Sequence, residues 1–170
     1  MLSGSWDGTS KIWDLESGEC TATLTGHKFA VTVCRLSTGY IVTGSADGIL
    51  TLWTQTGQKI KSVQAHSEII RNIIEVPDVG ILTCSNDTHI KLFGFGNLEE
   101  FANFSGIHEK FIYAIASLGS TDFVSGGEDN RIKTYIQGKE HDLILLPTTV
   151  WQIAIDFSMN KDIAVACGDG

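Results

Sequence analysis

The feature that most constrains this chain of 170 residues is an internal repeat of about 40 residues. Its clearest marker is a short turn motif, first seen as Gly4-Ser5-Trp6-Asp7-Gly8. The aspartates at the fourth position of this motif are 40, 40, 42 and 40 residues apart: Asp7, Asp47, Asp87, Asp129 and Asp169. An aromatic residue follows six positions after each of the first four: Trp13, Trp53, Phe93 and Tyr135. A histidine precedes three of these aspartates by 20 or 21 positions: His27, His66 and His108. Markers that stay in phase in this way indicate one structural unit used several times.

Each unit divides into short segments that are typical of β-strands. In the unit after His27 we expect strands over 29–36, 40–44, 49–54 and 58–64, separated by turn residues such as Asp47-Gly48. The chain is rich in isoleucine, valine and threonine, which favour strands, and its two prolines leave strands largely uninterrupted. The predicted fold class is therefore all-β.

A period near 40 with Gly-His, Asp and Trp markers resembles WD (WD40) repeats, whose four-stranded units form the blades of a β-propeller. We divide the chain into WD repeats as follows: a partial repeat 1–26, repeats 27–65, 66–106 and 107–146, and a partial repeat 147–170. About four blades are present. Because WD propellers usually have seven blades, the resemblance implies a segment of a larger propeller. A closed ring of four blades stays open as an alternative, because residues 3–7 and 165–169 are in phase.

The repeat markers lie at the spacing of the hydrogen-bonded tetrad of WD repeats. The resemblance implies three such networks: His27, Thr43, Asp47 and Trp53; His66, Thr83, Asp87 and Phe93; His108, Ser125, Asp129 and Tyr135. The same residue types perform Ser/His/Asp catalysis. An active site would occur once, whereas this set recurs at the repeat period, so we expect buried polar networks that hold loops and no enzyme activity.

Two repeats depart from the WD pattern. Phe93 lacks the indole N–H of tryptophan, so the second network loses a donor. In the last repeat Pro147 replaces the histidine and Val165 replaces the serine or threonine. The loops of that repeat must be held in another way.

Composition excludes several other functions. The net charge of −8 argues against nucleic-acid binding, because phosphate contacts need a basic face. The four cysteines lack the spacing of a zinc site, so we predict reduced thiols and neither metal nor cofactor. No secretory signal is visible at the start, and no apolar run approaches the length that spans a bilayer, so membrane insertion is not expected.

Residues near the start of each first strand are candidates for binding a partner. A β-propeller has a central channel, and the rim of residues around its mouth is exposed. Strand alternation places the third and fifth residues after each histidine at this rim, together with the residue before each aspartate. The informative members of this rim are Trp6, Arg71, Asn86, Phe111, Tyr113, Glu128 and Trp151. Aromatic residues and arginine are typical anchors of interfaces, so we interpret the rim as a partner-binding surface. Plugging of the channel by the aromatic side chains is the alternative.

Some runs go beyond the general WD pattern, above all Ser85-Asn86-Asp87 and Leu146-Pro147-Thr148-Thr149-Val150-Trp151. With the run from Ser3 to Trp13, they resemble the N-terminal propeller of the phospholipase A2-activating protein family over essentially all 170 residues. The resemblance implies a non-catalytic adaptor of the cytoplasm and nucleus that acts in ubiquitin-dependent protein degradation or sorting. Its propeller would bind ubiquitin, as monomer or chains, and an AAA segregase would dock on domains absent from this chain. A general WD scaffold for a trafficking or signalling complex is the alternative.

Ubiquitin presents an apolar patch ringed by basic residues, which the rim aromatics and Glu128 would complement. Arg71 fits this partner less well, and we expect it to hold Glu128 or Asn86 in place instead. Lys91 is assigned to the opposite rim.

Overall fold

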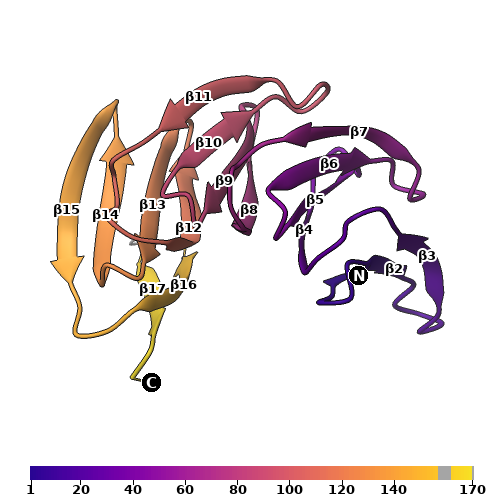
Figure 1. Ribbon diagram of the computed structural model, residues 1–170, viewed down its shortest axis with the longest axis horizontal. Coiled ribbons are helices and arrows are strands. Elements are labelled where there is room, and N and C mark those ends of the chain that lie inside the picture. The colour runs from indigo at the N-terminus through magenta and orange to yellow at the C-terminus, as the bar shows by residue number, and fades with distance from the viewer. Residues whose placement is uncertain (157–161, 170) are drawn as a thin grey trace.

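The structure is a computed structural model that describes residues 1–156 and 162–169, and it forms an open arc of five antiparallel sheets (Figure 1). The first sheet contains β1 (Leu2–Gly4), β2 (Ser10–Trp13) and β3 (Cys20–Leu24). The second contains β4 (Val31–Arg35), β5 (Ile41–Ser45), β6 (Ile49–Trp53) and β7 (Lys59–Gln64). The third contains β8 (Ile70–Val76), β9 (Gly80–Ser85), β10 (Ile90–Phe93) and β11 (Glu100–Phe104). The fourth contains β12 (Ile112–Gly119), β13 (Asp122–Gly127), β14 (Arg131–Ile136) and β15 (Lys139–Leu145). The fifth contains β16 (Val150–Ile155) and β17 (Ile163–Cys167).

The prediction of an all-β fold built from four-stranded sheets is confirmed. The described residues contain no helix, and so none that could cross a membrane. Within the described part of the chain, β1 pairs only with β2 and β17 only with β16, and the two ends of the arc lie apart (Figure 1). The alternative of a closed four-bladed ring is therefore wrong for these residues. Of the partial repeat 147–170, residues 157–161 and 170 lie outside the described ranges.

The hydrophobic core is divided into clusters that lie between neighbouring sheets. One cluster joins β5 and β6 to β8 and β9 through residues such as Val42, Leu50, Ile70 and Ile73. The inner strands β4, β8, β12 and β16 contact one another in this order. Burial between blades rather than inside one blade explains why the repeat has to be used several times to make a stable fold.

Close packing of the inner strands depends on small residues at the end of the second strand of a blade. A Cβ at Gly44 would lie 2.7 Å from Cγ2 of Ile70, and one at Gly126 would lie 2.6 Å from Cγ1 of Val150. The third sheet has the buried Cys84 at the corresponding position. These residues let the inner strand of the next blade approach the sheet closely.

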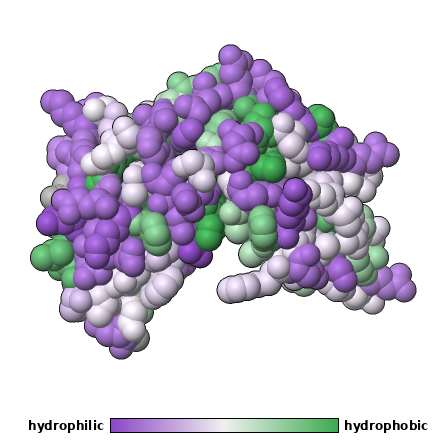
Figure 2. Space-filling model, in the orientation of Figure 1, coloured by the Kyte–Doolittle hydropathy of each residue, from purple (hydrophilic) through white to green (hydrophobic). Residues whose placement is uncertain are grey.

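The visible outer surface is mostly hydrophilic, with hydrophobic residues in separate groups (Figure 2). The lower edge in this view is hollowed where the arc is open (Figure 2). A pocket of about 530 Å³ lies along the later halves of β8, β12 and β16, lined by apolar residues such as Ile74, Ile115 and Ile155. None of the predicted rim residues lines it.

Candidate partner-binding rim

Two of the predicted networks are buried polar triads of the expected composition. His66 Nδ1 lies 2.9 Å from Asp87 Oδ2, and His66 Nε2 lies 2.8 Å from Thr83 Oγ1. His108 Nδ1 likewise lies 2.8 Å from Asp129 Oδ2, and its Nε2 lies 2.8 Å from Ser125 Oγ. Each aspartate also accepts one backbone N–H from its own turn and one from the residue after the histidine, so the triad ties two loops together.

The electrostatics of these aspartates follow from the contacts. Burial raises the pKa of Asp87, but the hydrogen bond and charge of His66, with backbone N–H groups, outweigh it and lower the pKa to about 2. The pKa of Asp129 is lowered by the same balance, with His108 in place of His66. Both carboxylates are therefore ionised at neutral pH.

The blade that contains His27 departs from this geometry. His27 Nδ1 and Asp47 Oδ1 are 4.0 Å apart, which is too long for a hydrogen bond. His27 Nε2 lies 2.7 Å from Thr43 Oγ1, to which Trp53 Nε1 donates at 2.8 Å. Indole donation thus supplements the weaker aspartate contact here.

The aromatic positions of the other two blades also behave differently from tryptophan. Phe93 has no donor and is buried in the apolar cluster shared with β5 and β6. Within the described residues, Tyr135 makes no hydrogen bond to Ser125. Its ring instead stacks on Phe123, with centroids 5.3 Å apart, and meets Phe104 edge-on at 4.8 Å. Apolar packing at Phe93 and ring contacts at Tyr135 thus replace the tetrad donor in these blades.

A threonine takes over the role of histidine in the last repeat. Thr148 Oγ1 donates to Asp169 Oδ1 at 3.2 Å and accepts the backbone N–H of Gly168 at 3.0 Å. Thr148, rather than Pro147, stands 21 residues before the aspartate, which is the spacing of His66 to Asp87 and of His108 to Asp129.

The triads have the atoms of a hydrolase but not its accessibility. Ser125 and Thr83 are fully buried, and His66 and His108 are almost fully buried. Such burial is typical of a polar network that holds loops in place. Among the described residues no group of three or more His, Cys, Asp or Glu side chains is arranged to hold a metal ion.

The predicted rim is shaped by a β-bulge that recurs in three sheets. The register shifts between Ile70 and Asn72, between Ile112 and Ala114, and between Val150 and Gln152. The extra residues at these bulges are Arg71, Tyr113 and Trp151. A bulge leaves its extra residue unpaired and changes its direction, so all three side chains leave the sheet at equivalent places.

The three bulge residues form one stack that crosses three blades. The Arg71 guanidinium carbon lies 5.1 Å from the ring centre of Tyr113. Tyr113 and Trp151 stack with centroids 4.7 Å apart and ring planes 13° from parallel. Phe111 meets Tyr113 edge-on at 6.4 Å. The structure thus brings Arg71, Phe111, Tyr113 and Trp151 together.

The residues before the aspartates support this stack. The backbone N–H groups of Asn86 and Glu128 donate to the carbonyls of Ile69 and Phe111 at 3.0 and 2.9 Å. Asn86 Oδ1 also accepts a hydrogen bond of 2.7 Å from Arg71 Nε, the contact expected for Arg71. Burial raises the pKa of the Tyr113 phenol, and the charge of Glu128 adds to this effect, while Arg71 opposes it.

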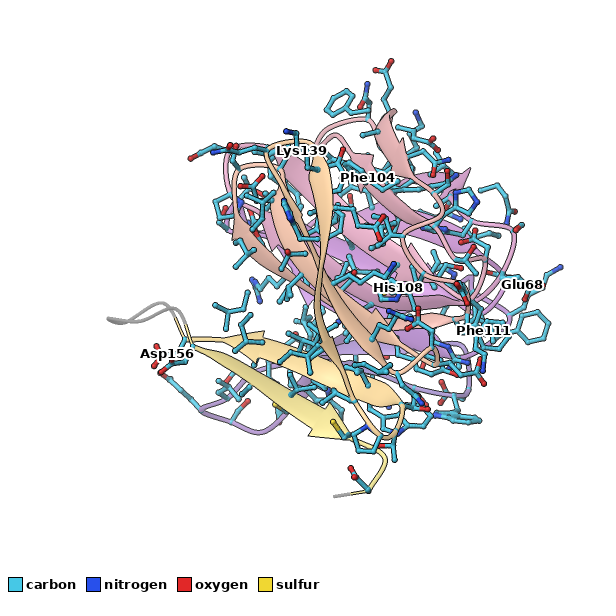
Figure 3. The ribbon with its side chains drawn as sticks, turned by 90° about the vertical axis from the view of Figure 1, so that its left-hand side faces the viewer. Glu68, Phe104, His108, Phe111, Lys139 and Asp156 are labelled. Carbon is cyan, nitrogen blue, oxygen red and sulfur yellow. The ribbon has the colours of Figure 1, made fainter. Side chains whose placement is uncertain are left out.

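Trp6 lies apart from the aromatic stack. Its side chain is 92% exposed and lines a shallow groove of about 260 Å³ with Thr32, Ile69 and Arg71. Arg71 therefore connects the groove to the stack. Phe111 projects to solvent from the same edge as Glu68, while Asp156 lies at the opposite end of the molecule (Figure 3).

Sequence reasoning placed the rim by simple strand alternation and missed the bulges. Alternation requires an unbroken register, and nothing in the residue types marks the extra residue. The assignment of Lys91 to the opposite rim is wrong, because Lys91 lines a small pocket beside His66 and Asp87. The opposite rim is formed by turns such as the one before Tyr40, where β4 ends and β5 begins.

Comparisons with known proteins agree with this architecture. A family model described as "WD domain, G-beta repeat" matches residues 18–54. Ubiquitin homeostasis protein lub1 of Schizosaccharomyces pombe is 34% identical over 173 residues, covering 100% of this chain and 23% of that protein. Ubiquitin fusion degradation protein 3 homolog of Caenorhabditis elegans is 29% identical over 194 residues, covering 100% of this chain and 22% of that protein. The crystal structure of the WD40 β-propeller domain of Doa1 superposes with a TM-score of 0.86 at 31% identity, over 99% of this chain and 57% of that chain.

The repeat, the sheets and the superposition define the class of this chain, which is a WD-repeat β-propeller domain. Such folds typically serve as scaffolds rather than catalysts. Within the class, the chain is a WD domain of the phospholipase A2-activating protein (PLAA/Doa1-like) type. It spans less than a quarter of the length of the two curated relatives named above.

Proposed function

We propose that this domain is a non-catalytic, ubiquitin-binding module of an adaptor in ubiquitin-dependent protein degradation or sorting. The observation that carries the proposal is the exposed aromatic stack on the rim of a domain whose full-length relatives are named for ubiquitin homeostasis and ubiquitin fusion degradation. The proposed contact surface consists of Trp6, Phe111, Tyr113, Glu128 and Trp151, with Arg71 and Asn86 supporting it from within the rim. An AAA segregase would act through other domains, in the cytoplasm and nucleus.

The rim chemistry matches the apolar and basic surface of ubiquitin. Phe111 and Trp151 are 40% and 51% exposed, which is unusual for large aromatic side chains in a folded domain. Both can still bury substantial area against a partner. Glu128 lies at the edge of the stack, and the chain as a whole carries a charge of −8, so basic residues around an apolar patch would be attracted.

Alanine substitution of the anchors tests the proposal. We expect Trp151→Ala and Phe111→Ala, made in the whole protein, to weaken ubiquitin binding about tenfold or more, because an aromatic anchor of this kind contributes about 2 kcal/mol. Titration of labelled ubiquitin followed by NMR measures the affinity, and circular dichroism verifies that each variant is folded.

Tyr40→Ala is the matched control, since Tyr40 is an aromatic residue of comparable exposure on the opposite rim. It should bind ubiquitin as the parent protein does. Folded Trp151→Ala and Phe111→Ala variants with parental affinity would exclude this rim and favour the channel-plug interpretation. A folded parent protein that does not bind ubiquitin would leave the general WD scaffold as the function.

A further inference from the structure

Asn86 differs from the other rim residues, because it is 7% exposed whereas the others are partly or widely exposed. A buried side chain of this kind offers little surface to a partner. Its Oδ1 atom is instead directed at Arg71 Nε, 2.7 Å away. The contact therefore acts within the rim.

Resting on the proposed function, we propose that Asn86 and Arg71 are positioning residues that hold the Tyr113–Trp151 platform in its partner-binding geometry. The order of contacts is Asn86 to Arg71 by a hydrogen bond, Arg71 to Tyr113 by cation–π contact, and Tyr113 to Trp151 by stacking. The first contact joins a turn to strand β8 within the third sheet, and the next two link that sheet to the fourth and fifth. The specificity-determining surface is thus a property of three blades together.

The bulges explain why such support is needed. Arg71, Tyr113 and Trp151 are each the unpaired residue of a bulge, so no directly opposite residue on the neighbouring strand supports their side chains. Arginine loses considerable rotamer freedom when it is ordered. The Asn86 bond fixes the guanidinium plane, and that plane in turn restricts Tyr113.

Charge complementarity defines what Arg71 contributes. A cation at the rim repels the basic residues that surround the apolar patch of ubiquitin, so direct contact would weaken binding. The guanidinium instead makes its contacts within the rim, as a hydrogen bond to Asn86 and a cation–π contact with the ring of Tyr113. A platform ordered before binding loses less entropy when the partner docks, which raises affinity without a new contact.

The test compares Asn86→Ala, Asn86→Asp and Arg71→Lys in the whole protein labelled with 5-fluorotryptophan. The ¹⁹F line of Trp151, assigned by its loss in Trp151→Phe, reports the stack without any partner. We expect this line to move in Asn86→Ala and in Arg71→Lys, which keeps the charge but loses the planar group and Nε. Asn86→Asp retains the acceptor oxygen, so its Trp151 ¹⁹F signal should stay at the parental position.

Ubiquitin affinity should follow the same pattern, with a loss of about three- to tenfold in Asn86→Ala and Arg71→Lys. Asn86→Asp should bind within about twofold of the parent. Asn97→Ala, which removes a turn asparagine of the opposite rim, is the control and should change neither readout.

A Trp151 ¹⁹F signal that stays at its parental position in folded Arg71→Lys would overturn the inference, whatever the ubiquitin affinity of that variant. Parental ubiquitin affinity in a variant whose line has moved would also overturn it. If the parent protein fails to bind ubiquitin, the proposed function fails, but the Trp151 line still decides whether Asn86 and Arg71 hold the platform.

Discussion

Side chains of the same type make different contacts from one blade of this domain to the next. The His66–Asp87 and His108–Asp129 pairs are hydrogen-bonded at 2.9 and 2.8 Å, whereas His27 and Asp47 stand 4.0 Å apart. The three pairs have the same residue types and nearly the same spacing. Their contribution to stability therefore differs between blades for geometric reasons.

At the residue scale we predict that Asp87→Asn lowers the free energy of unfolding at pH 7 by about 1–3 kcal/mol, because it removes an ionised acceptor from a buried network. The folded-state pKa of about 2 lies below the ordinary value, so the stabilisation is complete above about pH 4 and is lost as the pH falls toward 2. Urea unfolding at pH 7 and pH 3 measures both effects. Asp47→Asn is the control with a smaller loss, and an equal loss at the two aspartates would contradict the explanation.

Two features recur in the inner strands of the blades. One is a small residue at the end of the second strand, and the other is a bulge near the start of the first. The small residue admits the next blade, as Gly44 admits Ile70 and Ile73. The bulge directs one side chain to the rim, as at Tyr113. Packing between blades and projection at the rim thus depend on different strands of a blade.

At the element scale we predict that Gly44→Ala lowers the free energy of unfolding by about 1–3 kcal/mol through overpacking. The added Cβ would lie 2.7 and 2.8 Å from side-chain carbons of Ile70 and Ile73, and this apolar cluster has little room to shift. Thermal or urea unfolding measures the change. Gly96→Ala is the matched control, because nothing lies within 4 Å of its Cβ position. A Gly44→Ala variant as stable as the Gly96→Ala variant would show that the blades can move apart without cost.

The whole molecule is an array in which each sheet shares a core with its neighbours. The cluster around Ile73 contains residues from the second and third sheets, and the cluster around Ile115 contains residues from the third and fourth. Stability in such an array is carried by the interfaces between repeats. The same contacts hold the three blades that build the rim at a fixed spacing.

At the scale of the molecule we predict that Ile73→Ala lowers stability by about 2–5 kcal/mol and lowers amide protection in β5 as well as in β9. Ile73 is 4% exposed and packs between the sheets that contain these two strands. Hydrogen exchange of the whole protein measures protection strand by strand. Ile60→Ala, at an exposed position of β7, is the control. Loss of protection confined to the third sheet would mean that the blades unfold independently.

The sequence by itself determined the repeat, the four-stranded units, the residues of the triads and the positions of the rim. Those features depend on residue type at fixed spacing, and a period of 40 is visible without coordinates. Only the tertiary structure decided that Asp47 stands away from His27, that Thr148 replaces a histidine, and that bulges bring Arg71, Tyr113 and Trp151 into one stack. Each of these depends on register or on distances between separate blades. Side chains from repeats 40 residues apart meet only after the blades have packed, and no local pattern encodes that contact.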